Sequence, residues 1–112
     1  MTDCIFCKII KGELPCTKVY EDDEILAFRD INPAAPVHVL FIPKKHFASL
    51  GEAEPGDQAL LGRLLQVVGQ EAQKLGLTEG YRIVSNFGAS AGQTVDHFHI
   101  HLLGGRYMGA LC

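Results

Sequence analysis

Short apolar runs separated by turn-forming residues make up most of this chain, and one long stretch repeats its apolar positions at helical spacing. Four of the short runs predict β-strands: Lys18–Glu21, Ile25–Asp30, Val37–Ile42 and Tyr81–Ser85. The acidic pair Asp22 and Asp23 supplies a turn between the first two strands, so we expect them to form a hairpin. Asn32–Pro36 is an expected loop, and Pro43 ends the third strand.

Two segments have helical character. The first covers Cys4–Ile10, with Asp3 as the expected N-cap and Gly12 just past the end. The second runs from Gly56 to Leu75 and is followed by Gly76, a residue suited to end a helix. One face of this long helix is expected to be buried, and it comprises Leu61, Leu64, Leu65, Val68, Ala72 and Leu75.

The last apolar run carries three histidines at alternate positions, His97, His99 and His101. Successive side chains on a strand point to opposite faces, so the three imidazoles are expected to share one exposed face. The other face would bury the intervening residues Phe98, Ile100 and Leu102. A face with three imidazoles is suited to hold a metal ion or a phosphate group. A metal site of two alternate histidines is one alternative, and it needs further ligands from elsewhere.

Five strands, one short N-terminal helix and one long helix predict an α+β fold with a mostly antiparallel sheet. The 112 residues are expected to form a single domain, 1–112, and 47% of them are hydrophobic, which is sufficient for a core. The net charge of −3 provides no basic face, so we expect no binding to nucleic acid. An anionic ligand would have to be bound by local groups.

We find no signal-peptide pattern and no apolar stretch long enough for a membrane span, so we expect no membrane association. A chain of this kind with four cysteines is expected to keep them reduced in the cytoplasm. Cys16 and Cys112 have no evident partner or role.

The loop before the histidine run, Asn86–Gln93, is rich in small residues. Gly88 and Gly92 would let the backbone approach a ligand closely, and consecutive backbone N–H groups could bind an anion there. Gln93 and Thr94 add side-chain donors. The loop therefore favours a phosphate site beside the histidines.

Cys4 and Cys7 lie three residues apart, on one face of the first helix. A redox pair of this spacing normally follows a strand in a βαβ unit, whereas this pair opens the chain. Two thiolates supply half of a tetrahedral zinc site and need two histidines to complete it. Free, partly buried thiols are the alternative.

Several motifs together resemble the histidine-triad (HIT) family. Gln93–Leu103 is similar to the signature of that family, and three earlier blocks are similar to its other characteristic segments: Ile5–Ile10, Phe28–Ile31 and Val39–His46. Gly104–Arg106 resembles the Hint-like branch, the bacterial-type purine nucleoside phosphoramidases. The resemblance covers nearly the whole chain and implies the HIT-like fold.

This resemblance implies a hydrolase of purine nucleoside 5′-phosphoramidates and related nucleotidyl conjugates. His99 matches the family nucleophile, which forms a nucleotidyl-histidine intermediate; an imidazole with a pKa of about 6.5 is largely neutral and nucleophilic at pH 7. His101 matches the residue that contacts the phosphate, and His38 the residue that orients the nucleophile by a hydrogen bond. His97 completes the triad. The imidazole is itself the nucleophile, so no cofactor is required for catalysis.

The resemblance also implies the other contacts of the nucleotide. Asp30 matches the residue that accepts hydrogen bonds from the ribose hydroxyls. Four residues match those that form the family's apolar slot for the purine base: Ile5, Phe6, Ile9 and Ile31. Core packing is the alternative role for these four. The contacts to the phosphate and the leaving group match Asn86, Gln93 and Thr94.

Some bacterial members bind zinc through the cysteine pair and two histidines. The matching residues for such a structural Zn²⁺ are Cys4, Cys7, His46 and His97. Hint-like proteins are homodimers, and the long helix with Gly62 and Gly69 is a candidate contact between the two copies. The alternative is that both glycines are tolerated surface positions.

Three features depart from the Hint-like pattern. Asp96 stands where an aromatic residue is usual, Ala91 replaces a common glycine, and no Trp-containing tail follows Tyr107, which leaves the preferred amine open. Three other functions also stay open: a dinucleoside polyphosphate hydrolase, a nucleotide-binding regulatory module, and a zinc-binding interaction domain with little catalysis.

Overall fold

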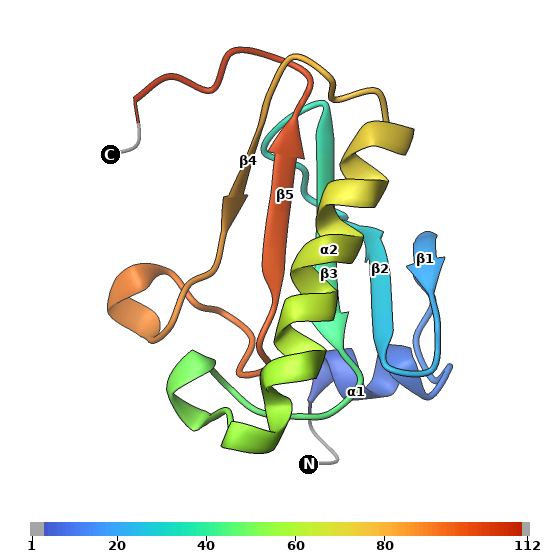
Figure 1. The fold of residues 1–112 in the computed structure, drawn as a ribbon, viewed down its shortest axis with the longest axis vertical. Coiled ribbons are helices and arrows are strands. Elements are labelled where there is room, and N and C mark those ends of the chain that lie inside the picture. The colour runs from blue at the N-terminus through green and yellow to red at the C-terminus, as the bar shows by residue number, and fades with distance from the viewer. Residues whose placement is uncertain (1–3, 111–112) are drawn as a thin grey trace.

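The computed structural model describes residues 4–110 and contains one five-stranded sheet and two α-helices (Figure 1). The elements are α1 (Ile5–Ile10), β1 (Lys18–Glu21), β2 (Ile25–Arg29), β3 (Val37–Pro43), α2 (Gln58–Lys74), β4 (Tyr81–Val84) and β5 (Ile100–Gly104). The strand order is β1-β2-β3-β5-β4, and each neighbouring pair is antiparallel. The predicted α+β fold is therefore confirmed. Within residues 4–110, no helix has the length and apolar character needed to cross a membrane.

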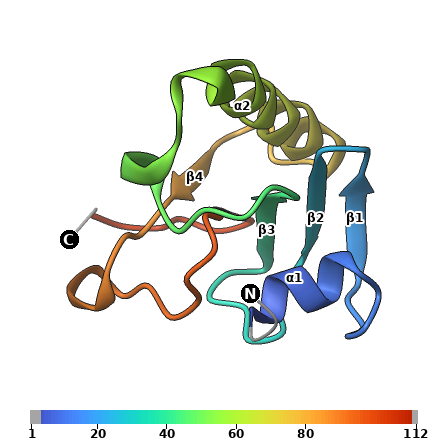
Figure 2. The same cartoon turned by 90° about the horizontal axis from the view of Figure 1, so that it is seen from below.

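The two helices lie on opposite faces of the sheet, as Figure 2 shows. The alternation of side chains along each strand supplies a core to both faces. On β3, Val39 and Phe41 belong to the core under α2, whereas Leu40 and Ile42 belong to a smaller core under α1 that includes Phe6. The face covered by α1 is also the face that carries the histidines.

The helix boundaries differ slightly from the sequence-based expectations. Helix α1 begins at Ile5 because Cys4 is its N-cap, with Sγ accepting the backbone N–H of Cys7 at 3.3 Å. The expected cap, Asp3, lies outside the described residues. Helix α2 begins two residues later than expected because Pro55–Asp57 form a 3₁₀ turn. Gly76 follows it with a φ of +83°, as predicted for a helix end.

The buried face of α2 also differs at one position. Leu65 was expected to be buried, but it is 52% exposed, and Val67 enters the core in its place. Successive residues are about 100° apart around a helix, so Leu65 lies at the edge of the face that is centred on Leu64 and Val68, and it reaches solvent.

Strand β5 begins at Ile100, not at His97, because the preceding residues leave the ladder. The backbone N–H of Phe98 donates to the carbonyl of Phe47 (2.6 Å). The alternation nevertheless holds: Phe98, Ile100 and Leu102 pack in the core under α2. The expected exposure is wrong, since His97 is fully buried and His99 is 5% exposed. Helix α1 covers them through Phe6, whose ring packs against the rings of both histidines.

Candidate functional site

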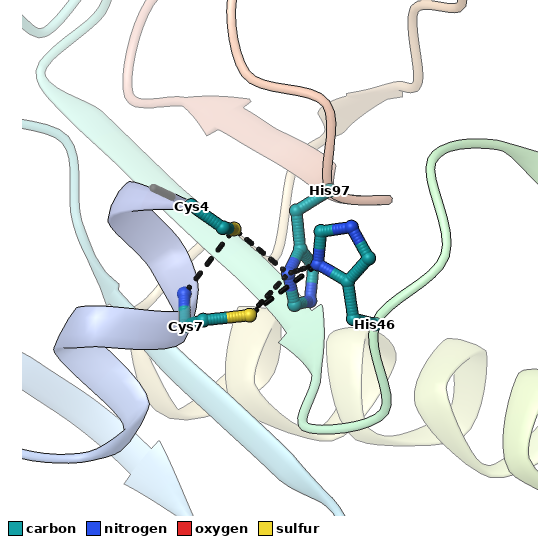
Figure 3. A group of neighbouring side chains, drawn as sticks. All are labelled: Cys4, Cys7, His46 and His97. Carbon is teal, nitrogen blue, oxygen red and sulfur yellow. Dashed lines mark hydrogen bonds between the residues drawn. The ribbon is translucent and has the colours of Figure 1, made fainter. Parts of the chain in front are cut away.

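Two clusters of polar side chains lie on the face covered by α1. The first brings together Cys4 and Cys7 from α1, His46 from the segment after β3, and His97 from the segment before β5 (Figure 3). Cys4 Sγ lies 3.4 Å from His97 Nδ1, and Cys7 Sγ lies 3.3 Å from His46 Nδ1. Cys7 Sγ is 3.7 Å from His97 Nδ1, and the two Nδ1 atoms are 3.1 Å apart.

These four donor atoms have the spacing of a tetrahedral zinc site. Zinc bonds of about 2.05 Å to nitrogen and 2.3 Å to sulfur place two nitrogens ~3.3 Å apart and a nitrogen and a sulfur ~3.6 Å apart. His97 Nε2–H donates to the carbonyl of Pro43 (2.8 Å), which leaves its Nδ1 lone pair facing the thiols. Burial lowers the pKa of His97 and favours the neutral ring that binds metal. The residues present therefore fit Zn²⁺.

Burial favours the metal-binding form of His97 but disfavours the metal-binding form of the thiols, which is the thiolate. Burial raises the pKa of the Cys7 thiol, and its neighbour Cys4 raises it further. A thiol binds metal as the thiolate, so metal binding here releases protons. Cys4, Cys7 and Cys16 are free thiols in this structure.

The second cluster consists of Asp30, His38 and His101. The backbone N–H of Ala34 donates to Nδ1 of His38 (3.0 Å), so the proton of the neutral His38 ring is on Nε2. His38 Nε2–H then donates to Nδ1 of His101 (2.9 Å). Asp30 Oδ2 lies 3.4 Å from His38 Nε2. His101 Nδ1 is therefore an acceptor, and its Nε2–H is left as a donor for a ligand.

His99 is held differently from the sequence-based expectation. Its Nδ1–H donates to the backbone carbonyl of His97 (2.7 Å), so the lone pair of the neutral ring is on Nε2. The expected hydrogen bond from His38 to His99 is wrong, because His38 bonds to His101 instead. The ring of Phe6 packs edge-on against His99 with centroids 5.2 Å apart. These contacts fix both the tautomer and the orientation of His99.

Burial also decides the charge of the second cluster. It lowers the pKa of His101 to about 4, with the nearby rings of His99 and His38 contributing and Asp30 opposing. Burial likewise lowers the pKa of His38, against the opposing charge of Asp30. Both rings are neutral at pH 7, which is the state that the hydrogen-bond chain requires.

We expect the variant His101→Gln to show a flatter dependence of unfolding free energy on pH. Between the folded pKa of about 4 and an unfolded pKa of about 6.5, the unfolded wild-type chain binds more protons at this residue. The stabilising contribution of neutral His101 is complete above about pH 6.5 and is lost as the pH falls toward 4, by about 2–3 kcal/mol. Urea unfolding at pH 7, 6 and 5 measures it; parallel curves for variant and wild type would contradict it.

The four residues expected to form the base slot divide into two groups. Phe6 is buried and Ile9 packs against the small core under α1, so core packing applies to both. Ile5 is 51% exposed and Ile31 is 89% exposed, which excludes core packing for this pair. Asp30 is half-buried beside Ile31, and its Oδ1 accepts the backbone N–H of Asn32 (2.8 Å).

Several hydrogen-bond donors of the loop before the histidines are used in bonds within the loop itself. The backbone N–H groups of residues 91–93 donate to the carbonyls of Gly88 and Ala89, so the expected anion nest is not free at these three positions. Gln93 Nε2–H₂ donates to the carbonyls of Ala48 and Val95, and its Oε1 accepts the N–H of Gly88. The expected role of Gln93 as a phosphate donor therefore does not fit this structure.

The two remaining loop residues keep donor capacity. Asn86 Nδ2 donates to the carbonyl of Ala91 (2.7 Å) and has a second hydrogen. Thr94 is exposed. Sequence analysis missed the carbonyls of His97 and Pro43, because backbone groups carry no residue-type signal.

Comparison with known proteins identifies the family. Residues 3–111 match the family model described as "Scavenger mRNA decapping enzyme C-term binding". The chain is 61% identical over 104 residues to an "Uncharacterized HIT-like protein" of Synechococcus elongatus, covering 93% of this chain and 91% of that protein. This chain belongs to the HIT family.

The HIT fold is equally clear from solved structures. The "HIT family hydrolase" from Clostridium thermocellum superposes with a TM-score of 0.94 at 50% identity, covering 98% of this chain and 96% of that one. Another relative, the "14 kDa zinc-binding protein" of Zea mays, is 54% identical over 106 residues, covering 93% of this chain and 83% of that protein. The predicted family and fold are thus confirmed.

Proposed function

We propose that this HIT protein hydrolyses the P–N bond of purine nucleoside 5′-phosphoramidates and related nucleotidyl conjugates, with His99 as the nucleophile. The observation that carries the proposal is the hydrogen bond from His99 Nδ1 to the carbonyl of His97, because it leaves the Nε2 lone pair free to attack phosphorus. An orienting acceptor behind a nucleophilic or basic imidazole is the arrangement that catalytic triads use.

The reaction proceeds in two displacements. His99 Nε2 forms a bond to the α-phosphorus as the P–N bond of the substrate breaks and the amine leaves. Water then attacks the same phosphorus, and the bond to His99 breaks to release the nucleotide. The leaving nitrogen takes up a proton from solvent in the first step, and the attacking water returns a proton to solvent in the second, so one water molecule is consumed overall.

His101 stabilises the phosphate during both steps. Its neutral ring accepts a hydrogen bond from His38 Nε2–H at Nδ1 and therefore presents Nε2–H to a phosphate oxygen. A donor that is already oriented loses little free energy to reorganisation as charge develops in the transition state. Thr94 and Asn86 are the further donors that we assign to the phosphate and the leaving group.

The exposed apolar pair beside the histidine face is our candidate for the base contact. Ile5 on α1 and Ile31 next to Asp30 in sequence offer exposed aliphatic surface, and Phe6 and Ile9 pack α1 onto the small core. A carboxylate is an acceptor only, so Asp30 suits the ribose hydroxyls, which are donors. A purine nucleotide is the partner that this combination fits.

The covalent intermediate tests this function. Protein mixed with adenosine 5′-phosphoramidate labelled at phosphorus and quenched in acid should carry label on His99. The variant His99→Ala should carry none. Turnover by the wild-type protein without label at any quench time would contradict the proposal, as would label on a different residue.

We also propose a structural role for Zn²⁺ at Cys4, Cys7, His46 and His97. A bound zinc ion would hold α1 against the segments that carry the two histidines and would take no part in the displacement. Free thiols that serve as ligands suit a reducing compartment, and we propose the cytoplasm. The name of the maize relative supports the metal, and it keeps a zinc-binding interaction domain as the second candidate function.

A homodimer is the oligomeric state that the exposed surface supports. Strand β4 is at one edge of the sheet, and Tyr81 and Ile83 on it are half exposed, beside the exposed Leu65 of α2. An apolar hollow of about 270 Å³ lies between these elements. Gly62 and Gly69, the expected contact positions on α2, are not closely approached within the described chain.

The variant Ile83→Asp should therefore dissociate the dimer, because it places a charge on the edge where a second copy would pair. Light scattering at micromolar concentration should give twice the chain mass for the wild-type protein and the chain mass for the variant. Leu14→Asp, an exposed apolar position outside this surface, is the control and should stay dimeric. A monomeric wild-type protein would contradict the proposal.

A further inference from the structure

Helix α1 contributes side chains to both the cysteine cluster and the surroundings of His99. Cys4 and Cys7 reach the donor atoms of His46 and His97. Phe6, between them in sequence, packs edge-on against the rings of both His97 and His99, with centroid separations of 5.8 and 5.2 Å. The helix therefore touches the nucleophile and the metal-binding atoms at the same time.

His97 connects the two sites through its own backbone. Its Nδ1 faces the thiols, its Nε2–H donates to the carbonyl of Pro43, and its carbonyl oxygen accepts Nδ1–H of His99. A side chain fixed at both ring nitrogens holds its backbone carbonyl in one position. Whatever fixes the ring of His97 therefore also fixes the acceptor that sets the tautomer of His99.

The attachment of α1 is weak without the cluster. A helix of six residues is not stable by itself and depends on what it packs against. Its apolar contacts come from Phe6, Ile9 and Ile10 on the small core. Ile5, on the same helix, is exposed and is one of the two residues that we propose to contact the base. Ordering α1 thus orders part of that site as well.

We propose that metal binding at Cys4, Cys7, His46 and His97 and nucleotide binding at His99 are thermodynamically linked through α1. Each ligand raises the affinity of the protein for the other by the same factor, as linkage requires. Phe6 is a positioning residue in this coupling, since it contacts both sites. The inference rests on the proposed nucleotide-binding function, and it extends that function by assigning to the metal site control over affinity.

The test compares AMP affinity in the zinc-loaded and the metal-depleted chain by calorimetry. We expect metal removal to weaken AMP binding by about 5- to 100-fold, and saturating AMP to tighten Zn²⁺ binding, measured against a chromophoric chelator, by the same factor. Nitrogen NMR at one fixed pH should show the His99 proton on Nδ1 in the zinc-loaded chain and divided between both ring nitrogens after metal removal.

Two variants identify the route of the coupling. Phe6→Leu keeps an apolar side chain but loses the ring contacts, so we expect it to bind both ligands with a coupling factor closer to 1. Cys16→Ser changes a thiol that packs near α1 but lies outside the cluster, and it should keep the wild-type factor.

Each outcome separates the inference from the proposed function. Equal AMP affinity with and without zinc overturns the linkage and leaves the hydrolase proposal intact. Failure of the zinc-loaded chain to bind AMP overturns the proposed function itself. An undiminished coupling factor in Phe6→Leu, or a metal-depleted chain that has lost its sheet by circular dichroism, overturns the route through α1.

Discussion

The variant His99→Ala is expected to lower kcat/KM for phosphoramidate hydrolysis by about 10⁴-fold or more, because it removes the atom that forms the covalent bond. The remaining hydrogen-bond donors cannot replace a nucleophile. Initial rates with adenosine 5′-phosphoramidate, followed by release of AMP, give the measurement.

Folding of the variant provides the necessary control. His99 contacts Phe6 and the carbonyl of His97 but lies outside the zinc cluster, so the variant should keep its zinc content and its circular dichroism. Free imidazole added to the variant should restore part of the rate by entering the space left by the ring. A His99→Ala protein with more than a tenth of wild-type activity would show that another group attacks phosphorus.

Replacing Cys4 with serine is expected to produce the second large effect, on metal content and stability. Serine preserves the N-cap of α1, so the variant removes one metal ligand without removing the cap. We expect one zinc per wild-type chain and less than about a tenth of that in the variant after dialysis against a chelator. The midpoint of thermal unfolding should fall by roughly 10 °C, which corresponds to a loss of about 2–3 kcal/mol.

A matched cysteine distinguishes metal binding from a general effect of losing a thiol. Cys16 is partly buried near the same small core but has no place in the cluster. Cys16→Ser should therefore retain the wild-type zinc content. A metal-free wild-type protein with undiminished stability, or equal zinc in both variants, would rule out a structural metal at these residues.

The sequence predicted which segments form helices and strands, and which face of the last strand is buried under α2. The alternation of apolar residues with histidines along the last strand correctly placed Phe98, Ile100 and Leu102 in the core under α2. Gly76 and Pro43 marked element ends where a helix terminates and a strand stops. These properties depend on local geometry, which residue type and spacing record directly.

The properties that the sequence did not predict depend on contacts between distant segments. The burial of His99 follows from the docking of Phe6, and the partner of His38 follows from the alignment of β3 with β5. The loss of free backbone donors in the loop follows from the internal hydrogen bonds of residues 88–93. A residue pattern contains the side chains that take part but not the pairing that tertiary packing selects.

The separation of the metal-binding residues along the chain determines when the N-terminal helix can be locked. Cys4 and His97 are 93 positions apart, so most of the polypeptide must be synthesised before all four ligands exist in one molecule. Contacts this distant in sequence form late in folding, because they close the largest loop. We therefore expect the earliest-made segment, α1, to be among the last to reach its final place.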